Sequence, residues 1–295
     1  MPAVFSTLEE RYLPEHRSAV AQLLARSQEC RVVVFSPGTC TQTSRLFRSQ
    51  LLSAAEKELL AQRAVGDAEL ILHEHGRLGV RSRYRYIQGF GHHYVAVPEV
   101  TVTPDSGVFD ISLSVTNLSS YQPMPLQYMC HMNHAFVSGG VMSDNLGEGA
   151  FQLRCTVPAH VIPTPEWEEI NRKILAGEYD ASSLEGAEAF DPEIVYFAED
   201  LPTKAEQAEF KLTRPDGSAF VTSFSTDEFP VATHWILHNP DQSVSAFALP
   251  GTSRPEGFLA AKKAGTLIEL EPGKTRSFTV TTGLKNADEL KEAHS

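Results

Sequence analysis

From residue 69 to residue 157 the sequence consists of short stretches in which apolar and polar residues alternate, separated by Gly, Pro, Asn and Asp. Alternation with a period of two is typical of a β-strand with one buried face. The gaps between these stretches are too short to hold crossover helices, which excludes a parallel, doubly wound sheet. The sequence therefore predicts an all-β fold, an antiparallel β-sandwich with a few short peripheral helices.

Two helices are predicted among the strands. Thr164 to Gly177 begins with a capping Thr followed by Pro, carries acids in its first turn and ends on Gly. Residues 53–63 begin on Ser53 with Glu56 three residues on, which is a capping-box pattern. Strands are predicted at residues 31–36, 69–73, 84–88, 94–103, 108–116, 126–136, 151–157, 193–199, 232–237, 243–249, 265–270 and 274–283, with a Pro-Asp-Gly hairpin over residues 210–224.

The charge and hydrophobicity of the sequence argue against nucleic-acid and membrane partners. The 295 residues carry a net charge of −12, and Lys and Arg form no patch, whereas nucleic-acid binders concentrate these residues. No apolar run approaches the length that crosses a bilayer, and the start lacks the pattern of a secretion signal. We therefore expect a cytoplasmic protein without a nucleic-acid or membrane partner, a single domain over residues 1–295, as a monomer or homodimer.

The stretch from Tyr128 to Phe136 places polar residues in an otherwise apolar strand. Because side chains alternate along a strand, His131 and Asn133 are expected on one face and His134 on the other.

A second polar stretch covers residues 71–77. Interpreted as a continuous strand, it places His73, His75 and Arg77 on one face and Glu74 opposite. We expect the two stretches to form the walls of one polar cleft.

Three short motifs in a fixed order resemble the aldose 1-epimerase-like branch of the galactose mutarotase superfamily. They are His75-Gly-Arg77, Val115-Thr-Asn117 and the strand that ends in His131-Met-Asn133. The segments 248–257 and 265–283 are similar to the terminal hairpin of that family. The resemblance defines a mutarotase-like region at residues 70–285 and a divergent N-terminal part at residues 1–69.

This resemblance implies a β-supersandwich that binds a monosaccharide or sugar acid. In such proteins a His donates a proton to the ring oxygen while a carboxylate removes the anomeric proton, and His131 matches the His. The carboxylate position matches Leu249, which cannot accept a proton. The catalytic residues expected here are therefore His131 and, as the base, Glu256, with Glu74, Glu148, His234 and His238 as alternatives. The substrate-binding residues expected are His73, His75, Arg77, Asn133, His234 and Trp235.

Structural roles compete with each of these assignments. Apart from the resemblance, His131 in an apolar strand is more typical of a core histidine with its hydrogen bonds satisfied. Trp235 is more typical of a core residue than of a platform for a sugar, although a pyranose ring often stacks on an aromatic face.

Three functional classes remain open. The first is an epimerase, mutarotase or isomerase that acts on a sugar by acid–base chemistry without a cofactor. The second is a sugar-binding protein without catalysis, which Leu249 favours. The third is a metal-assisted sugar isomerase or lyase with His73, His75 and His131 as ligands.

Overall fold

The structure is a computed structural model that describes residues 31–32, 68–158, 161–180, 182–185 and 190–292. The helix predicted at residues 53–63 and most of the strand predicted at residues 31–36 lie outside these ranges. The described strands are β1 (Arg31–Val32), β2 (Ala68–Leu72), β3 (Leu78–Ser82), β4 (Tyr84–Ile87), β5 (His93–Val102), β6 (Val108–Asn117), β7 (Met124–Leu126), β8 (Met132–Asn133), β9 (Val141–Asp144), β10 (Gln152–Leu153), β11 (Ile194–Ala198), β12 (Gln207–Thr213), β13 (Ala219–Ser225), β14 (Val231–His238), β15 (Ser243–Gly251), β16 (Ile268–Leu270) and β17 (Thr275–Lys285).

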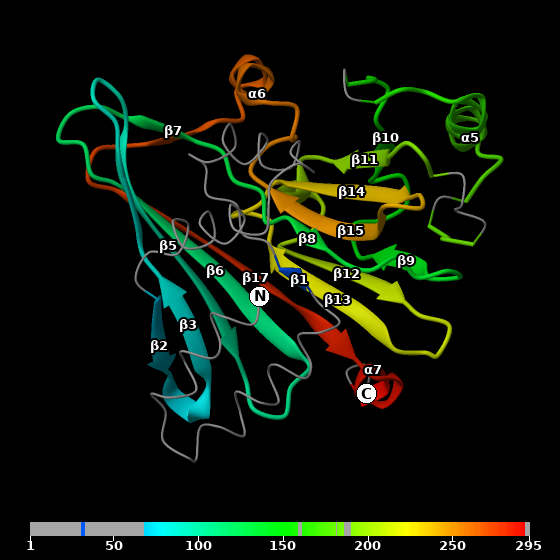
Figure 1. The fold of residues 1–295 in the computed structure, drawn as a ribbon, viewed down its shortest axis with the longest axis horizontal. Helices are drawn as coiled ribbons and strands as arrows, with labels where there is room; N and C mark the ends of the chain where they lie inside the picture. The colour runs from blue at the N-terminus through cyan, green and yellow to red at the C-terminus, as the bar shows by residue number, and fades with distance from the viewer. Residues whose placement is uncertain (1–30, 33–67, 159–160, 181, 186–189, 293–295) are drawn as a thin grey trace.

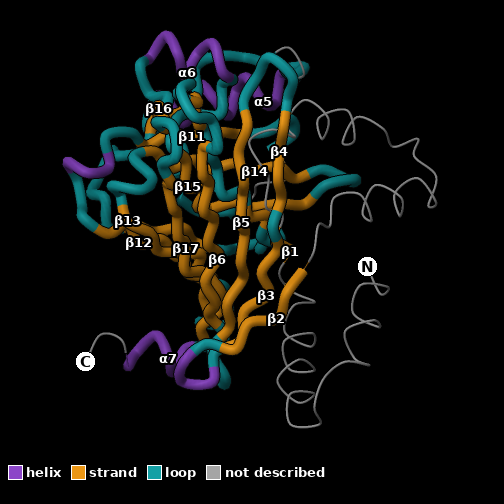
Figure 2. The backbone as a smooth tube through the Cα atoms, turned by 90° about the vertical axis from the view of Figure 1, so that its left-hand side faces the viewer, coloured by secondary structure: helices purple, strands orange, loops and turns teal. Residues whose placement is uncertain are grey.

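Nine of the described strands form a larger sheet, in the order β2-β3-β5-β6-β17-β13-β12-β9 with β4 paired to the remaining length of β5. The long strands β5, β6 and β17 lie side by side and make its centre (Figure 1, Figure 2). Neighbouring strands of this sheet pair antiparallel. The prediction of an antiparallel β fold is therefore confirmed.

A smaller sheet packs against the larger one. Its regular strands follow the order β10-β11-β14-β15, and the stretch 128–136, which contains β8, continues it on the far side of β15. β8 pairs in turn with β1, and a separate two-stranded ladder joins β7 to β16.

The core lies between the facing surfaces of the two sheets. Along β6 the inward residues Ile111, Leu113 and Val115 are at most 2% exposed, while the outward Ser114 hydroxyl lies 2.9 Å from the Ser277 hydroxyl of β17. This alternation is the pattern from which the strand was predicted. β6 therefore has a polar outward face and an apolar inward face.

Short helices lie at the periphery of the sandwich (Figure 1). They are α5 (Pro165–Leu175), α6 (Phe258–Ala264), α7 (Ala287–Glu292), and the 3-10 turns η1 (Glu74–Gly76) and η3 (Leu201–Thr203). α5 begins as predicted, because the Thr164 hydroxyl accepts a hydrogen bond from the Trp167 amide. Within the described ranges, none of the helices has the length and hydrophobicity to cross a bilayer.

Candidate functional site

Residues 128–136 run antiparallel to β15 and are held to it by backbone hydrogen bonds. The Cys130 amide donates to the Pro250 carbonyl (2.9 Å), and the Ser245 amide donates to the His134 carbonyl (3.0 Å). Cys130 and His134 are each 1% exposed, whereas His131 and Asn133 between them are partly exposed. His131 and Asn133 therefore lie on the outward face of the smaller sheet.

His131 contacts a polar cluster built from three other strands or strand ends. Its ring packs edge-on against Trp235, with ring centroids 5.6 Å apart. The Trp235 indole donates to the Glu193 carboxylate (2.5 Å), whose other oxygen lies 2.9 Å from the Arg154 guanidinium. Trp167 of α5 donates to the Glu193 backbone carbonyl (3.0 Å). We call His131, Trp235, Glu193 and Arg154 the Trp235 cluster.

The strand register explains why these side chains share a face. Val195 pairs with Trp235 across β11 and β14, and paired residues of an antiparallel sheet point the same way. Glu193 lies two residues before Val195, and the Arg154 amide donates to the Val195 carbonyl (2.8 Å). Arg154 and Glu193 were not predicted as site residues, because 39 positions separate them in the sequence and only the sheet brings them together.

Burial sets the protonation state of His131. It lowers the pKa of the imidazole, and a hydrogen bond with Asn133 offsets part of that effect. The ring is therefore neutral at pH 7. A neutral imidazole carries one N–H donor and one acceptor, so His131 can either donate a hydrogen bond to a sugar oxygen or accept a proton.

His234 does not join this cluster. It points inward from β14, is 7% exposed, and stacks on Phe151 with ring centroids 3.6 Å apart. Burial lowers its pKa to about 4. Strand alternation sends His234 into the core while Trp235 points outward, so the structure does not bring His234 together with Trp235 as the substrate-binding assignment expects.

Glu256, the expected base, lies in the loop after β15 and is exposed. Its carboxylate accepts from the Thr156 hydroxyl (3.3 Å) and lies 3.9 Å from the Arg254 guanidinium. Arg254 also pairs with Glu199 and lies 4.8 Å from the ring centroid of Phe197. Phe197 follows Val195 by two residues, so this loop covers the outward face that carries the Trp235 cluster.

Leu249, at the position expected for a carboxylate, is 1% exposed in β15 and pairs with Thr233. Glu148, an alternative base, is exposed and shows no described contact with the Trp235 cluster.

The predicted strand face of His73, His75 and Arg77 is wrong. β2 ends at Leu72, and His75 sits in the turn η1 with a φ of 60°, which breaks the alternation. Arg77 forms an ion pair with Asp110, which also accepts from the Thr281 hydroxyl (2.7 Å).

His73 belongs to a second carboxylate cluster. Its Nε2 lies 2.5 Å from Glu99, and the Arg81 Nε donates to the other oxygen of Glu99 (2.8 Å). We call His73, Glu99 and Arg81 the Glu99 cluster. Glu99 and Asp110 alternate with the inward residues Val100 and Ile111. The Glu99 cluster and the Arg77–Asp110 ion pair therefore both lie on the outward face of the larger sheet.

The two polar stretches therefore occupy opposite outer faces of the sandwich, and the expected single cleft is wrong. His73, His75 and His131 are not gathered into a ligand set. In the part of the chain that the structure describes, no group of three or more His, Cys, Asp or Glu side chains is arranged to hold a metal.

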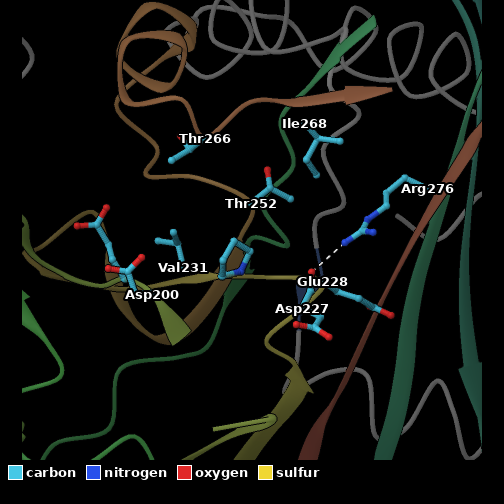
Figure 3. A pocket seen from close by; sticks show the side chains of 10 residues that line it. Asp200, Asp227, Glu228, Val231, Thr252, Thr266, Ile268 and Arg276 are labelled. Carbon is cyan, nitrogen blue, oxygen red and sulfur yellow. Dashed lines mark hydrogen bonds between the residues drawn. The ribbon is translucent and has the colours of Figure 1, made fainter. Parts of the chain in front are cut away.

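A cavity of about 190 Å³ lies beside the smaller sheet (Figure 3). Its walls carry Glu199, Asp200, Asp227 and Glu228 against a single guanidinium, Arg276, which donates to the Asp227 backbone carbonyl (2.8 Å). None of the residues predicted for the site lines this cavity, and its excess of carboxylates disfavours an anionic ligand.

The fold is shared with solved structures at low sequence identity. A provisionally named aldose 1-epimerase from Klebsiella pneumoniae aligns with a TM-score of 0.59 and 17% identity over 76% of this chain and 55% of that protein. The Slr1438 protein from Synechocystis aligns with a TM-score of 0.50 and 15% identity over 74% and 66% of the two chains. A galactose mutarotase related enzyme from Lactobacillus acidophilus gives a TM-score of 0.50 and 10% identity over 75% and 72%.

The chain thus spans about half of the length of the Klebsiella protein. No curated protein sequence matches it. A protein family does match, over residues 67–284, and it is described as a domain of unknown function, DUF4432. Because the match covers most of the chain, the protein belongs to the DUF4432 family.

Proposed function

We propose that the protein binds a monosaccharide or sugar acid at the Trp235 cluster and interconverts its anomers, as an aldose 1-epimerase-like isomerase. The observation that carries the proposal is the contact between His131 and Trp235 on an outward sheet face, beside Asn133. A titratable ring, an aromatic ring and an amide on one sheet face support the proposal of a common ligand there. The superfamily fold supports a sugar as that ligand.

Each side chain has a definite task in this proposal. Trp235 offers an apolar ring for the C–H face of a pyranose, and its hydrogen bond to Glu193 fixes the ring in place. Asn133 can bond a sugar hydroxyl through its amide. His131 exchanges a proton with the ring oxygen or the anomeric hydroxyl, the step that opens the ring.

Leu249 favours a second candidate function, sugar binding without catalysis. The buried leucine leaves the expected carboxylate position without a proton acceptor. Glu256, in the loop over the same face, is the base that we propose. A cytoplasmic location and a monomeric or homodimeric state remain predictions from the sequence.

Saturation-transfer and exchange NMR on a panel of aldoses and uronates tests both candidates, because it reports binding and anomeric exchange together. In the isomerase proposal, His131→Asn lowers the exchange rate by roughly 10²–10⁴-fold, the contribution of a positioned proton donor. The variant should still fold, because the smaller polar side chain of Asn fits the same position, so exchange is compared between folded proteins.

His134→Asn is the matched control on the same stretch. This ring is buried against Phe220 and Phe247, so the substitution should lower stability while the exchange rate of the folded protein survives. Equal loss of exchange in both variants would contradict the role of His131. Binding without accelerated exchange in the wild-type protein would establish the second candidate instead.

A further inference from the structure

A second cavity of about 190 Å³ opens at the end of the larger sheet where β4 meets β5. It shares no lining residue with the Trp235 cluster. None of the residues that line it is Asp, Glu, Lys or Arg, and its walls include Tyr86, Tyr94, Gln88, His92, Met124 and Leu126. We call it the β4–β5 pocket. This lining suits an uncharged, ring-shaped ligand.

Two tyrosines form one wall of the pocket. Tyr86 of β4 pairs directly with Tyr94 of β5, and their rings stack with centroids 5.1 Å apart and an interplanar angle of 25°. Tyr94 is 4% exposed, whereas Tyr86 is partly exposed. The buried ring therefore supports the exposed one, which gives the pocket a rigid aromatic wall.

Polar groups are gathered at the edge of that wall. The Tyr86 hydroxyl donates to the Gln88 side-chain carbonyl (3.3 Å), and the Gln88 amide nitrogen of the backbone donates to the His92 carbonyl (3.2 Å). Gly91 makes room for this arrangement, since a Cβ there would lie 2.5 Å from the Gln88 side-chain oxygen. An amide and an imidazole thus stand beside an aromatic face.

Two exposed aromatic rings lie in the loops around the pocket. Phe90, between the lining residues Gln88 and His92, is fully exposed with a φ of 58°. Tyr121 is 85% exposed in the loop that leads from β6 to the lining residue Met124. A left-handed backbone is unfavourable for Phe, and such positions concentrate at binding sites.

We propose that the β4–β5 pocket is a second sugar site, which takes one uncharged pyranose ring of a glycoside or glycan. The apolar face of the ring packs on Tyr86, while Gln88 and His92 bond its hydroxyls. Phe90 and Tyr121 cover the ring or the next residue of a longer glycan. This site does not depend on the function proposed for the Trp235 cluster.

The test uses methyl α-glucopyranoside and methyl β-galactopyranoside, which have no free anomeric hydroxyl and cannot be interconverted at His131. Saturation transfer is measured in the Trp235→Ala protein, which lacks the aromatic face proposed to bind a sugar at the first site. At least one glycoside should still bind. Gln88→Ala, Phe90→Ala and Tyr121→Ala should each weaken that binding by roughly three- to tenfold, the range of one ring contact or hydrogen bond.

Phe258→Ala is the matched control, because Phe258 is also an exposed ring (49%) but lies on α6, outside the pocket lining. It should leave binding unchanged. The proposal is overturned if neither glycoside binds, or if Gln88→Ala and Phe90→Ala bind as tightly as the parent. It also fails if sedimentation shows that Phe90→Ala dissociates a dimer while glycoside binding is unaffected, since the rings would then serve self-association.

Discussion

Each outward face of the sandwich holds a carboxylate that contacts one arginine and one aromatic ring, Glu193 on the smaller sheet and Glu99 on the larger. The two arrangements differ in how exposed their side chains are and in what surrounds them. In the Trp235 cluster, the Arg154 and Glu193 side chains are 11% and 14% exposed. In the Glu99 cluster, Glu99 is similarly enclosed, but Arg81 is 37% and His73 33% exposed.

The difference in exposure suits a candidate functional site in the Trp235 cluster and a structural contact between strands in the Glu99 cluster. The enclosed ion pair of the Trp235 cluster fixes an indole that contacts His131, so its charges are used to hold a ring in position. The partly solvated Glu99 cluster joins three neighbouring strands, β3, β5 and the end of β2, and borders no candidate catalytic group. Charge enclosed by protein organises chemistry more rigidly than the same charge shared with water.

The largest expected effect is a difference in anomeric exchange between a variant of the smaller sheet and a variant of the larger sheet. His131→Asn should reduce anomeric exchange by roughly 10²–10⁴-fold, whereas Arg77→Ala should leave it unchanged, because Arg77 pairs with Asp110 on the other side of the sandwich. Exchange NMR on the two purified variants measures both. A loss of exchange in Arg77→Ala would mean that the larger sheet contributes to the site after all.

Acid should weaken the core around His234 and the Glu99 cluster in different pH ranges. Burial lowers the pKa of His234 to about 4, so the unfolded ring binds a proton below its ordinary 6.5 while the folded ring does not. Stability is then lost as the pH falls from 6.5 to 4, by roughly 3 kcal/mol for this ring. Urea unfolding against pH measures the loss. His234→Phe should reduce the slope of the curve in that range without abolishing it, because burial also lowers the pKa of His134 to about 4.

The Glu99 cluster should respond only at lower pH. Burial raises the pKa of Glu99, but hydrogen bonds from Arg81 and His73 and the charge of Arg81 outweigh it and lower the pKa below 4.5. A carboxylate with a lowered pKa stabilises the fold above 4.5 and loses that contribution as the pH falls through the folded value. Arg81→Ala should therefore lower stability at pH values above 4.5, and its difference from the parent protein should shrink as the pH falls through the folded pKa of Glu99.

Removing one arginine from each cluster should sharpen the contrast in stability. Arg154→Ala leaves the Glu193 carboxylate enclosed without its partner and should cost about 2 kcal/mol, since truncating a buried pair is expensive. Arg81→Ala, at a solvated pair, should cost less than about 1 kcal/mol. Chemical denaturation of both variants at pH 7 decides the comparison, and equal losses would show that exposure does not distinguish the clusters.

A similarly small effect is expected of Gly79→Ala. An added Cβ would lie 2.3 Å from a Glu99 carboxylate oxygen and 2.9 Å from the His73 ring. Both are ends of side chains that can move, so the cost should be about 1 kcal/mol, without any effect on anomeric exchange. Gly89→Ala is the control, because a Cβ there meets nothing within 4 Å.

The regular strands were predictable because their burial alternates. The strand predicted at residues 108–116 is found at Val108–Asn117, and the Pro-Asp-Gly hairpin joins β12 and β13. β9 and α6 were missed, since Val141–Asp144 is short and mostly exposed and Phe258–Ala264 lacks a capping side chain. The strand expected at residues 126–136 is extended but regular only in pieces, because it is held by isolated bridges to β15.

The site was predictable only where a single stretch defines it. Strand alternation placed His131 and Asn133 together from their spacing. It failed for His73, His75 and Arg77, because a turn with positive φ at His75 and Gly76 ends the strand. Gly76 was the local signal of that turn, since glycine adopts positive φ without strain. Arg154 and Glu193 had no local signal at all, since their pairing depends on the register of β10, β11 and β14.

The position of β17 in the larger sheet has a consequence for synthesis of the chain. β17 lies between β6 and β13, with Phe278 opposite Leu113 and Phe224 opposite Val280. The first half of the larger sheet can therefore join the second only when residues 275–285 have emerged from the ribosome. Until then β6 and β13 each present an unpaired edge, and such edges invite pairing with other chains. A nascent chain that stalls before residue 275 should accordingly aggregate rather than fold.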